Sequence, residues 1–345
     1  MIIKLQESHI IGAIISYLLG VFIVPLVIAY SKKQGLIDEP NERKIHKKPI
    51  SRLGGVAIFL STMLTFLFLV FLSYYPSGSL LSGILLGSSL MFLLGLIDDV
   101  YTLDAKFKLF IQVAIVTLVF LLGVRIDSII NPFGGVVHLG WLLSYIITLL
   151  WIVGISNAVN FIDGIDGLAG SVITVNSITL GLIAIKVMPT NPYVLTAFIL
   201  AGSMLAFLTF NFNPAKIFMG DSGTLFSGFL LATLSIVGVM KTATLAIFLP
   251  FVVLAVPIID ITYASLRRIS KGKSPFVADS EHIHHKLLKA GFSQNMTVAI
   301  LTSIAIVGGA IASYFAGSIK HYVIYIIALV LIMFLLNLIT LLTKK

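Results

Sequence analysis

The feature that most constrains the fold is a series of long apolar runs separated by short polar intervals. Eleven runs approach the ~20 residues with which an α-helix crosses the hydrocarbon core of a bilayer. They lie at roughly 9–30, 53–73, 80–97, 107–124, 139–156, 168–187, 193–210, 224–240, 243–266, 297–317 and 321–342. Charged residues make up only 11% of the chain, whereas soluble domains carry about 25%. We therefore expect an all-α, polytopic integral membrane protein with about 11 transmembrane helices.

The polar intervals leave no room for a separate soluble domain. The longest one, about 267–295, is too short to form a hydrophobic core of its own. The first apolar run is too long for a cleaved signal segment, so we expect it to remain as the first span. The chain has no cysteine, which excludes disulfides and thiolate metal sites. We expect one transmembrane domain over residues 1–345.

Lysine and arginine predict the orientation of this domain. If the N-terminus lies outside, the inner segments hold 18 of the 23 basic residues, with seven in 31–52 and six in 267–289. This bias follows the positive-inside rule and places the C-terminus in the cytoplasm. The net charge of +9 then gathers on the cytoplasmic face, where it attracts anionic lipid heads or a polyanionic substrate. Nucleic acid is disfavoured as a partner because no soluble basic module is present.

With this topology, the unusual polar residues fall on one side of the membrane. They lie in cytoplasmic loops near 31–55, 98–108, 157–167, 211–223 and 267–296. Polar groups buried at a membrane need partners, ligands or water. The sequence therefore predicts one shared active site on the cytoplasmic face. The alternative is an ordinary scatter of solvated loop ends.

Asp98 and Asp99 close the third apolar run. Carboxylates at the carboxyl end of a helix oppose the macrodipole unless a cation lies near them. Adjacent carboxylates also raise each other's proton affinity, which suits a general base. The alternative is a pair of interfacial acids that cap a loop. We expect Asp104, Lys106 and Lys108 to belong to that loop or to the start of the next helix.

The second polar cluster follows the fifth run at Asn157, Asn160, Asp163 and Asp166. A spacing of three places each neighbouring pair side by side on a helical turn. Gly164 allows the chain to break and the backbone to approach a ligand closely. Amide and carboxylate oxygens favour Mg²⁺ or Mn²⁺ over zinc. The alternative is a set of polar residues that cap two helices.

The third cluster runs from Asn211 to Asp221. Pro214 ends the preceding helix, and Gly220 makes a tight turn that presents Asp221 just before the next run. An anion or its metal could meet the exposed amides of that helix start. Phe218 either stacks on a planar base or faces the core or the lipid.

Histidines and basic residues form the remaining clusters. The best placed are Arg267, Arg268, His282, His284 and His285. Imidazoles and guanidiniums around a diphosphate fit this composition better than a zinc site, because oxygen donors dominate elsewhere and cysteine is absent. A basic juxtamembrane loop is the alternative. In the 31–55 loop, Lys48 either contacts phosphate or anchors the chain to lipid heads.

Four motifs together resemble a known family. They are the Asp-Asp pair, N-x-x-N-x-x-D-G-x-D-G, F-M-G-D-S-G and H-I-H-H, which follow one another within about 38–288. They resemble the polyprenyl-phosphate N-acetylhexosamine-1-phosphate transferases of glycosyltransferase family 4. The resemblance implies Mg²⁺-dependent transfer of a sugar 1-phosphate from a UDP-sugar to undecaprenyl phosphate, with release of UMP. It also implies a bacterial inner-membrane enzyme of cell-wall, lipopolysaccharide or teichoic acid synthesis, and a homodimer as one option.

The resemblance also implies roles for particular residues. It implies metal ligands at Asn160 and Asp221 and a lipid-phosphate base, or positioning group, at Asp98 or Asp99. The histidine motif and nearby arginines are expected to hold the diphosphate and the sugar. The expected nucleotide contacts are Asp163, Gly164, Asp166, Asn211 and Phe218, with Phe218 under the uracil. Asn157 and Lys48 complete the expected substrate-binding set.

Several alternatives remain open from the sequence. The H-I-H-H form is similar to the branch that transfers N-acetylglucosamine 1-phosphate, but phospho-N-acetylmuramoyl-pentapeptide transfer is the alternative. A secondary transporter is the main non-enzyme hypothesis, although it predicts ionisable groups near the membrane midplane. A lipid phosphotransferase acting on nucleotide alcohols is disfavoured because D-G-x-x-A-R is absent.

Overall fold

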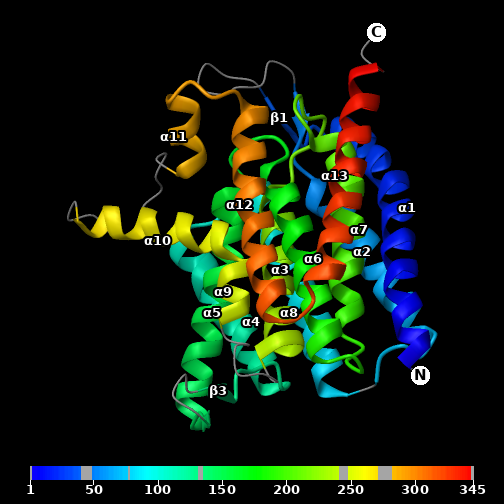
Figure 1. Ribbon diagram of the computed structural model, residues 1–345. Helices are drawn as coiled ribbons and strands as arrows, with labels where there is room; N and C mark the ends of the chain where they lie inside the picture. Colours follow the sequence, from blue (N-terminus) through cyan, green and yellow to red (C-terminus); the bar gives the residue numbers. More distant parts are fainter. Residues whose placement is uncertain are drawn as a thin grey trace.

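The computed structural model describes residues 2–39, 49–76, 78–130, 135–240, 248–270 and 282–342, and within them the chain is mostly helical (Figure 1). The helices are α1 (Ile2–Gln34), α2 (Gly54–Phe71), α3 (Ser79–Tyr101), α4 (Ala105–Leu121), α5 (Trp141–Ile162), α6 (Leu168–Val187), α7 (Val194–Asn211), α8 (Gly220–Ser235), α9 (Phe248–Val253), α10 (Ala255–Ser270), α11 (Ile283–Lys289), α12 (Gln294–Phe315) and α13 (Ile319–Leu342). A π-helical turn, Ile236–Met240, extends α8. The strands are β1 (Ile37–Asp38), β2 (Ile50–Ser51), β3 (Ser128–Ile130) and β4 (Val136–His138).

Eight helices in the described part of the chain are long and apolar enough to cross a membrane. They are α1, α2, α3, α5, α6, α7, α8 with its π-helical turn, and α12. This confirms the expectation of a polytopic membrane protein. Of the other three expected runs, one is α4, one is divided between α9 and α10, and one forms α13.

The expected span over 243–266 is not one straight helix. Helix α9 ends at Val253, and α10 begins at Ala255 and extends sideways from the bundle (Figure 1). Pro257 explains the break, because a proline has no N–H to donate and its ring clashes with the carbonyl four residues earlier, that of Val253. The break turns α10 away from the direction of α9 and into contact with α5 (Figure 1).

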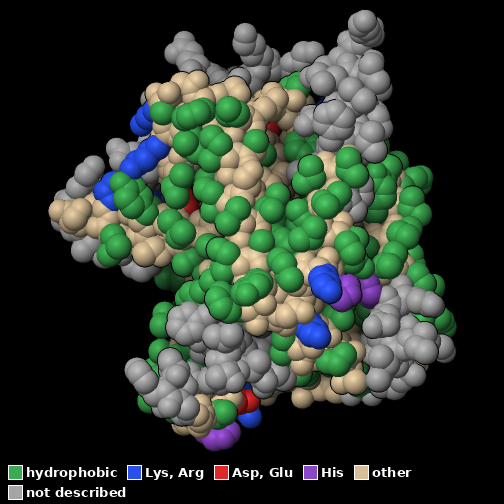
Figure 2. Space-filling view, in the orientation of Figure 1, with side chains coloured by type: hydrophobic (Ala, Val, Ile, Leu, Met, Phe, Trp, Pro, Cys, Tyr) green, Lys and Arg blue, Asp and Glu red, His purple; other side chains and the backbone are tan. Residues whose placement is uncertain are grey.

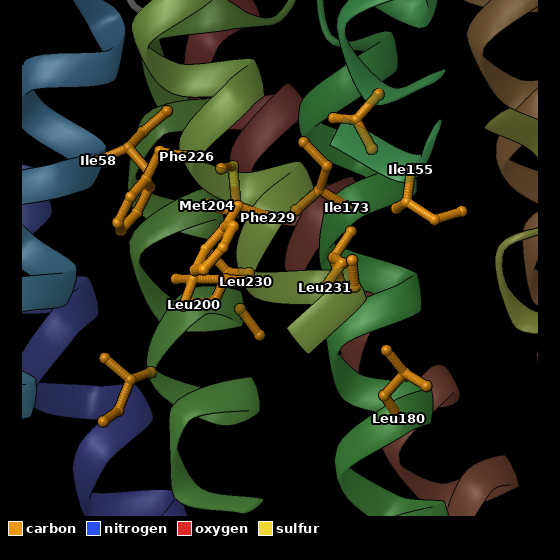
Figure 3. Close-up of a cluster of buried hydrophobic side chains, with 14 of the residues drawn as sticks. Ile58, Ile155, Ile173, Leu180, Leu200, Met204, Phe226, Phe229, Leu230 and Leu231 are labelled. Atoms are coloured by element: carbon orange, nitrogen blue, oxygen red, sulfur yellow. The ribbon is translucent and has the colours of Figure 1, made fainter. Parts of the chain in front are cut away.

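Helices α6 and α8 form the centre of the bundle. In the most apolar stretch of α6, 94% of the residues are buried, against 28% for α1 at the periphery. Ile173 and Leu180 of α6 and Phe226 and Phe229 of α8 belong to one cluster of buried side chains (Figure 3). Helix α3 packs closely on α8 because Gly87 has no side chain; a Cβ there would lie 2.4 Å from the Phe229 ring. Such small residues are typical of helix contacts in membranes.

The periphery is apolar, as a surface in contact with lipid requires. Ile14, Leu18 and Phe22 of α1 are 52%, 60% and 70% exposed. Figure 2 shows apolar side chains spread over most of the visible face.

The two short hairpins lie at opposite ends of the bundle (Figure 1). Hairpin β3–β4 is at one end, and hairpin β1–β2 is at the other end, where α11 also lies. Backbone bonds join the β1–β2 end to the turn before α8: Gly54 N–H donates to the carbonyl of Phe218 at 2.9 Å, and Gly55 N–H donates to that of Met219 at 2.8 Å. Ser51 and Ile217 also form a parallel bridge. Loops distant in sequence are thereby held together at one end.

Candidate active site

The N-terminus of α8 is anchored by Asp99. Its carboxylate accepts hydrogen bonds from the N–H of Asp221 at 2.7 Å, the N–H of Ser222 at 3.0 Å and the Ser222 hydroxyl at 2.6 Å. The first N–H groups of a helix have no partner within it, and a carboxylate there also interacts well with the helix dipole. Asp99 therefore fixes the position of Asp221 relative to α3.

Two glycines make this contact between α3 and α8 possible. Gly220 has φ +70°, in the left-handed region, and a Cβ there would lie 2.6 Å from Asp99 Oδ2. A Cβ on Gly95 of α3 would lie 2.4 Å from the carbonyl oxygen of Asp221. A side chain at either position would push α3 and the start of α8 apart.

Lys108 lies between two of the predicted carboxylates. Its Nζ donates to Asp98 Oδ2 at 3.0 Å and forms an ion pair with Asp221. The other oxygen of Asp98 accepts from the N–H of Leu103 at 2.7 Å. The sequence reasoning placed Lys108 only in the loop or helix start. It does lie in the first turn of α4, which Asp104 caps, but its ammonium group reaches the candidate site.

The residues predicted to hold a metal lie around Thr224. Asn160 at the end of α5 donates through Nδ2 to Thr224 Oγ1 at 2.8 Å, and that hydroxyl lies 3.3 Å from the carbonyl oxygen of Asp221. In the described part of the chain, no three His, Asp or Glu side chains form a metal-binding group. The amide and carboxylate oxygens are nevertheless donors that suit Mg²⁺. The Lys108 ammonium already held between Asp98 and Asp221 shows that this place accommodates positive charge.

Asp163 carries a perturbed carboxyl group just after α5. Burial, with the nearby charges of Asp99 and Asp166, raises the pKa of Asp163 from its ordinary value to about 7. A cation would stabilise the charged form of a carboxyl group that is buried beside other carboxylates. The structure thus places Asp163 within the electrostatic field of Asp99.

Two other predicted residues hold loops together. Asp166 Oδ2 accepts from Asn213 Nδ2 at 3.0 Å and from the N–H of Ala215 at 3.1 Å. Asn211 Oδ1 accepts from the N–H of Gly167 at 2.9 Å, and its Nδ2 donates to the carbonyl of Ile217 at 2.8 Å. These bonds join the loop after α5 to the loop before α8. The atoms of Asp166 and Asn211 that make these bonds, in residues expected to contact the nucleotide, already have protein partners.

Asn157 pairs with a residue that the sequence reasoning did not select. Its Nδ2 donates to Gln112 Oε1 at 2.6 Å and to the carbonyl of Val153 at 2.8 Å, and Gln112 Nε2 donates back at 3.3 Å. Gln112 is fully buried in α4. This reciprocal amide pair joins α4 to α5 and orients the end of α5 that carries Asn160.

The histidine motif packs against the loop after α5. The ring of His284 lies so close to Gly164 that a Cβ on this glycine would be 2.0 Å from Nε2. Burial, with a smaller contribution from His285, lowers the pKa of His284 to about 4. Among the described residues, no group hydrogen-bonds the buried Nε2 of His284. His282 lies beside it with its ring parallel to that of His284, at 5.8 Å between centroids.

The remaining predicted residues differ in how deeply their side chains are buried. Arg268 is buried, whereas Arg267 lies over the Tyr263 ring with its Cζ 5.6 Å from the centroid. The backbone N–H of Phe218 donates to the carbonyl of Ser51 at 2.8 Å, and its side chain is half-buried. Lys48 lies outside the described residues.

These features define a polytopic membrane protein with an anionic, cation-holding site at one end of its helix bundle. Residues 81–239 match the family described as Glycosyl transferase family 4. The chain is 37% identical over 300 residues to a "Probable undecaprenyl-phosphate N-acetylglucosaminyl 1-phosphate transferase" of Bacillus subtilis (strain 168), covering 86% of this chain and 82% of that protein.

Two further relatives agree. A "Decaprenyl-phosphate N-acetylglucosaminephosphotransferase" of Mycobacterium tuberculosis (strain ATCC 25618 / H37Rv) is 32% identical over 327 residues, covering 87% of this chain and 80% of that protein. An "Undecaprenyl-phosphate alpha-N-acetylglucosaminyl 1-phosphate transferase" of Escherichia coli (strain K12) is 29% identical over 281 residues, covering 80% and 75% respectively. The chain belongs to glycosyl transferase family 4, which confirms the resemblance found from its motifs.

Proposed function

We propose that this protein transfers N-acetylglucosamine 1-phosphate from UDP-N-acetylglucosamine to undecaprenyl phosphate and releases UMP. The observation that carries the proposal is the placement of the Lys108 ammonium between Asp98 and Asp221, where α3, α4 and α8 meet. Two anionic reactants can approach each other only where positive charge compensates them. The names of the three relatives support N-acetylglucosamine 1-phosphate as the group transferred. Those of the Bacillus subtilis and Escherichia coli relatives support undecaprenyl phosphate as the lipid carrier.

In this proposal Asp98, rather than Asp99, accepts the proton of the lipid phosphate or positions that phosphate. Asp99 uses both carboxylate oxygens to hold the start of α8. Asp98 instead pairs with the flexible side chain of Lys108, which can turn from the carboxylate to an incoming phosphate. The deprotonated lipid phosphate would then attack the β-phosphorus of the UDP-sugar linkage, and UMP would leave.

We propose Asn160 and Asp221 as the residues that hold Mg²⁺, with Mn²⁺ as the alternative. The ion would supply positive charge to the diphosphate. His284 contributes an uncharged, buried imidazole whose Nε2 can meet a polar group of the donor. Arg268, buried on the inner side of α10, would complete the positive surroundings of the diphosphate.

We further propose that the N-terminus lies outside, that eleven spans form one domain over residues 1–345, and that the site faces the cytoplasm of a bacterial inner membrane. The distribution of lysine and arginine supports this orientation. Because the chain has no cysteine, His138→Cys in β4 and Lys289→Cys in α11 each introduce a single exposed thiol. On intact cells an impermeant maleimide should label only His138→Cys; labelling of Lys289→Cys would reverse the topology. A homodimer stays a prediction of the family resemblance.

The direct test of function offers purified protein undecaprenyl phosphate, Mg²⁺ and one UDP-sugar at a time. We expect UMP and a lipid-linked sugar with UDP-N-acetylglucosamine, and neither product with UDP-N-acetylmuramoyl-pentapeptide. Asp221→Ala should abolish UMP release, whereas Asp127→Ala, at the opposite end of the bundle, should leave it intact. Turnover with the pentapeptide substrate alone would replace the proposal by the other branch of the family.

A further inference from the structure

Helix α10 turns its polar side inward and its apolar side outward. Ile259, Tyr263 and Leu266 are 52%, 44% and 62% exposed. Asp260 and Arg268, on the opposite side, are 2% and 4% exposed. A buried carboxylate is costly unless it receives hydrogen bonds or pairs with a cation, so the partners of Asp260 indicate its purpose.

Both oxygens of Asp260 bind the beginning of α11. The Nδ1–H of His282 donates to Oδ2 at 2.8 Å, and the N–H of Ile283 donates to Oδ1 at 2.8 Å. The side chains of Asp260 and His282 are only 3% and 6% exposed, so water does not weaken this pair. A carboxylate can only accept, and therefore the proton of the His282 ring is held on Nδ1.

The plane of the His282 ring is also fixed. The ring lies nearly parallel to Phe161, with 5.4 Å between centroids and 21° between planes. On the motif itself, the ring of His284 is parallel to it within 2°. Phe161 directly follows Asn160, so the stacking relates His282 to the predicted metal ligand at the end of α5.

We infer that Asp260 is a positioning residue that sets the tautomer and orientation of His282, so that His282 Nε2 is the nitrogen that can take up a proton and then donate to the donor diphosphate. The inference rests on the proposed function and deepens it. A carboxylate on Nδ1 also stabilises the positive ring that forms when Nε2 takes a proton or meets a phosphate. The carboxylate thereby joins α10, which carries Arg268, to the histidine motif.

Asp260→Asn tests the tautomer directly. The amide oxygen can still accept from Ile283 N–H, but its NH₂ group then faces His282 Nδ1 and requires a lone pair there. The proton should move to Nε2. Nitrogen NMR of ¹⁵N-histidine-labelled protein distinguishes protonated from unprotonated ring nitrogens, and His282→Asn assigns the signal among the seven histidines. An unchanged Nδ1–H signal in Asp260→Asn would overturn the inference.

Kinetics provide the second readout. Asp260→Asn should lower kcat roughly 10- to 100-fold, as losing a partner of a functional histidine does. The KM for UDP-N-acetylglucosamine should change by less than about threefold, because the donor still binds. In a His282→Asn background the further effect of Asp260→Asn should be less than about twofold, since both changes disrupt one unit. Independent, multiplying effects would overturn the inference.

His282→Asn keeps the inference testable if Asp260→Asn does not fold. The asparagine Nδ2 can replace Nδ1 in the bond to Asp260, but nothing replaces Nε2. This variant should fold with wild-type thermal stability and lose kcat; full activity would overturn the inference. Asp104→Asn is the matched control, because Asp104 also accepts two backbone N–H groups at a helix start, but they belong to Lys106 and Phe107 and not to the histidine motif. If wild-type protein releases no UMP, the proposed function fails, while the NMR test of Asp260 still stands.

Discussion

Gly164→Ala tests whether the histidine motif belongs to the site. A Cβ at Gly164 would lie 2.0 Å from His284 Nε2, 2.6 Å from Cε1 and 2.9 Å from Cδ2. Ordinary contact begins at 3.4 Å, so the ring must move by about 1.4 Å. A shift of the α11 start to make room would strain the bonds that Asp260 makes to His282 and to the N–H of Ile283. A misplacement of ~1 Å can cost on the order of 10²-fold in rate, and we expect kcat to fall by about that factor.

The assay is UMP release under saturating UDP-N-acetylglucosamine, with thermal stability measured on the same samples. Overpacking should lower the free energy of unfolding by about 1–3 kcal/mol. Gly154→Ala is the control, since a Cβ at that position of α5 would meet no described atom within 4 Å. It should retain wild-type turnover. If Gly164→Ala stays within threefold of wild type while remaining folded, His284 plays no part in turnover and the placement of the motif is wrong.

Three further predictions concern the carboxylates. Asp98→Asn and Asp99→Asn should both abolish most turnover. Only Asp99→Asn should lower the free energy of unfolding, by about 1–3 kcal/mol, because it leaves N–H donors of α8 unpaired. If calorimetry shows that Asp98→Asn is the less stable variant, the roles of the two residues are exchanged. Lys108→Met should lower turnover. It should also lower the Mg²⁺ concentration needed for half-maximal activity, because it removes the ammonium group that competes with Mg²⁺ at Asp221. A rise in that concentration would contradict the proposed competition. The pKa of Asp163 is raised to about 7 in the folded protein. Between about pH 4 and 7 the folded state therefore holds a proton that the unfolded state has lost. The free energy of unfolding should fall as pH rises through this range. Measured in EDTA over that range, Asp163→Asn should lose up to ~4 kcal/mol less stability than wild type; equal pH dependence would refute the assignment.

The sequence predicted the class of fold and the end of the molecule that holds the site. Apolar runs predicted the helices, because a helix is the form in which a single segment satisfies its backbone within lipid. The expected topology put the loops of Asp98, Asp99 and Asp221 on one face, and the structure brings these residues together. What it missed in the fold was the break at Pro257, although proline within an apolar run is a recognisable signal.

The motifs did not predict which side chains of distant helices would pair with the site residues. Lys108 resembles an ordinary lysine in the first turn of a helix, and only the packing of α4 brings its ammonium between Asp98 and Asp221. Gln112 and Asp260 lie inside apolar stretches without a motif of their own. A polar residue fully buried between helices usually has a specific partner. Searching the apolar runs for isolated Gln or Asp is therefore the signal that could have found both.

The polar residues of the motifs divide into two groups by what their atoms already bind. In the first group, side-chain oxygens accept backbone N–H groups of neighbouring segments; its members are Asp99, Asp166 and Asn211. Asp98 and Asp221 instead share the side chain of Lys108, which can move when a charged ligand arrives. Alanine at any of these five positions would abolish turnover, so lost activity cannot separate the groups. Stability can separate the two groups. Removing a side chain that pairs buried N–H groups lowers the free energy of unfolding by about 1–3 kcal/mol. Removing one of two carboxylates that compete for one ammonium group relieves the repulsion between them. The first group should therefore lose stability with activity, and Asp221 should lose activity with little loss of stability. Asp98 should lie between the two groups, because its Oδ1 also accepts from the N–H of Leu103.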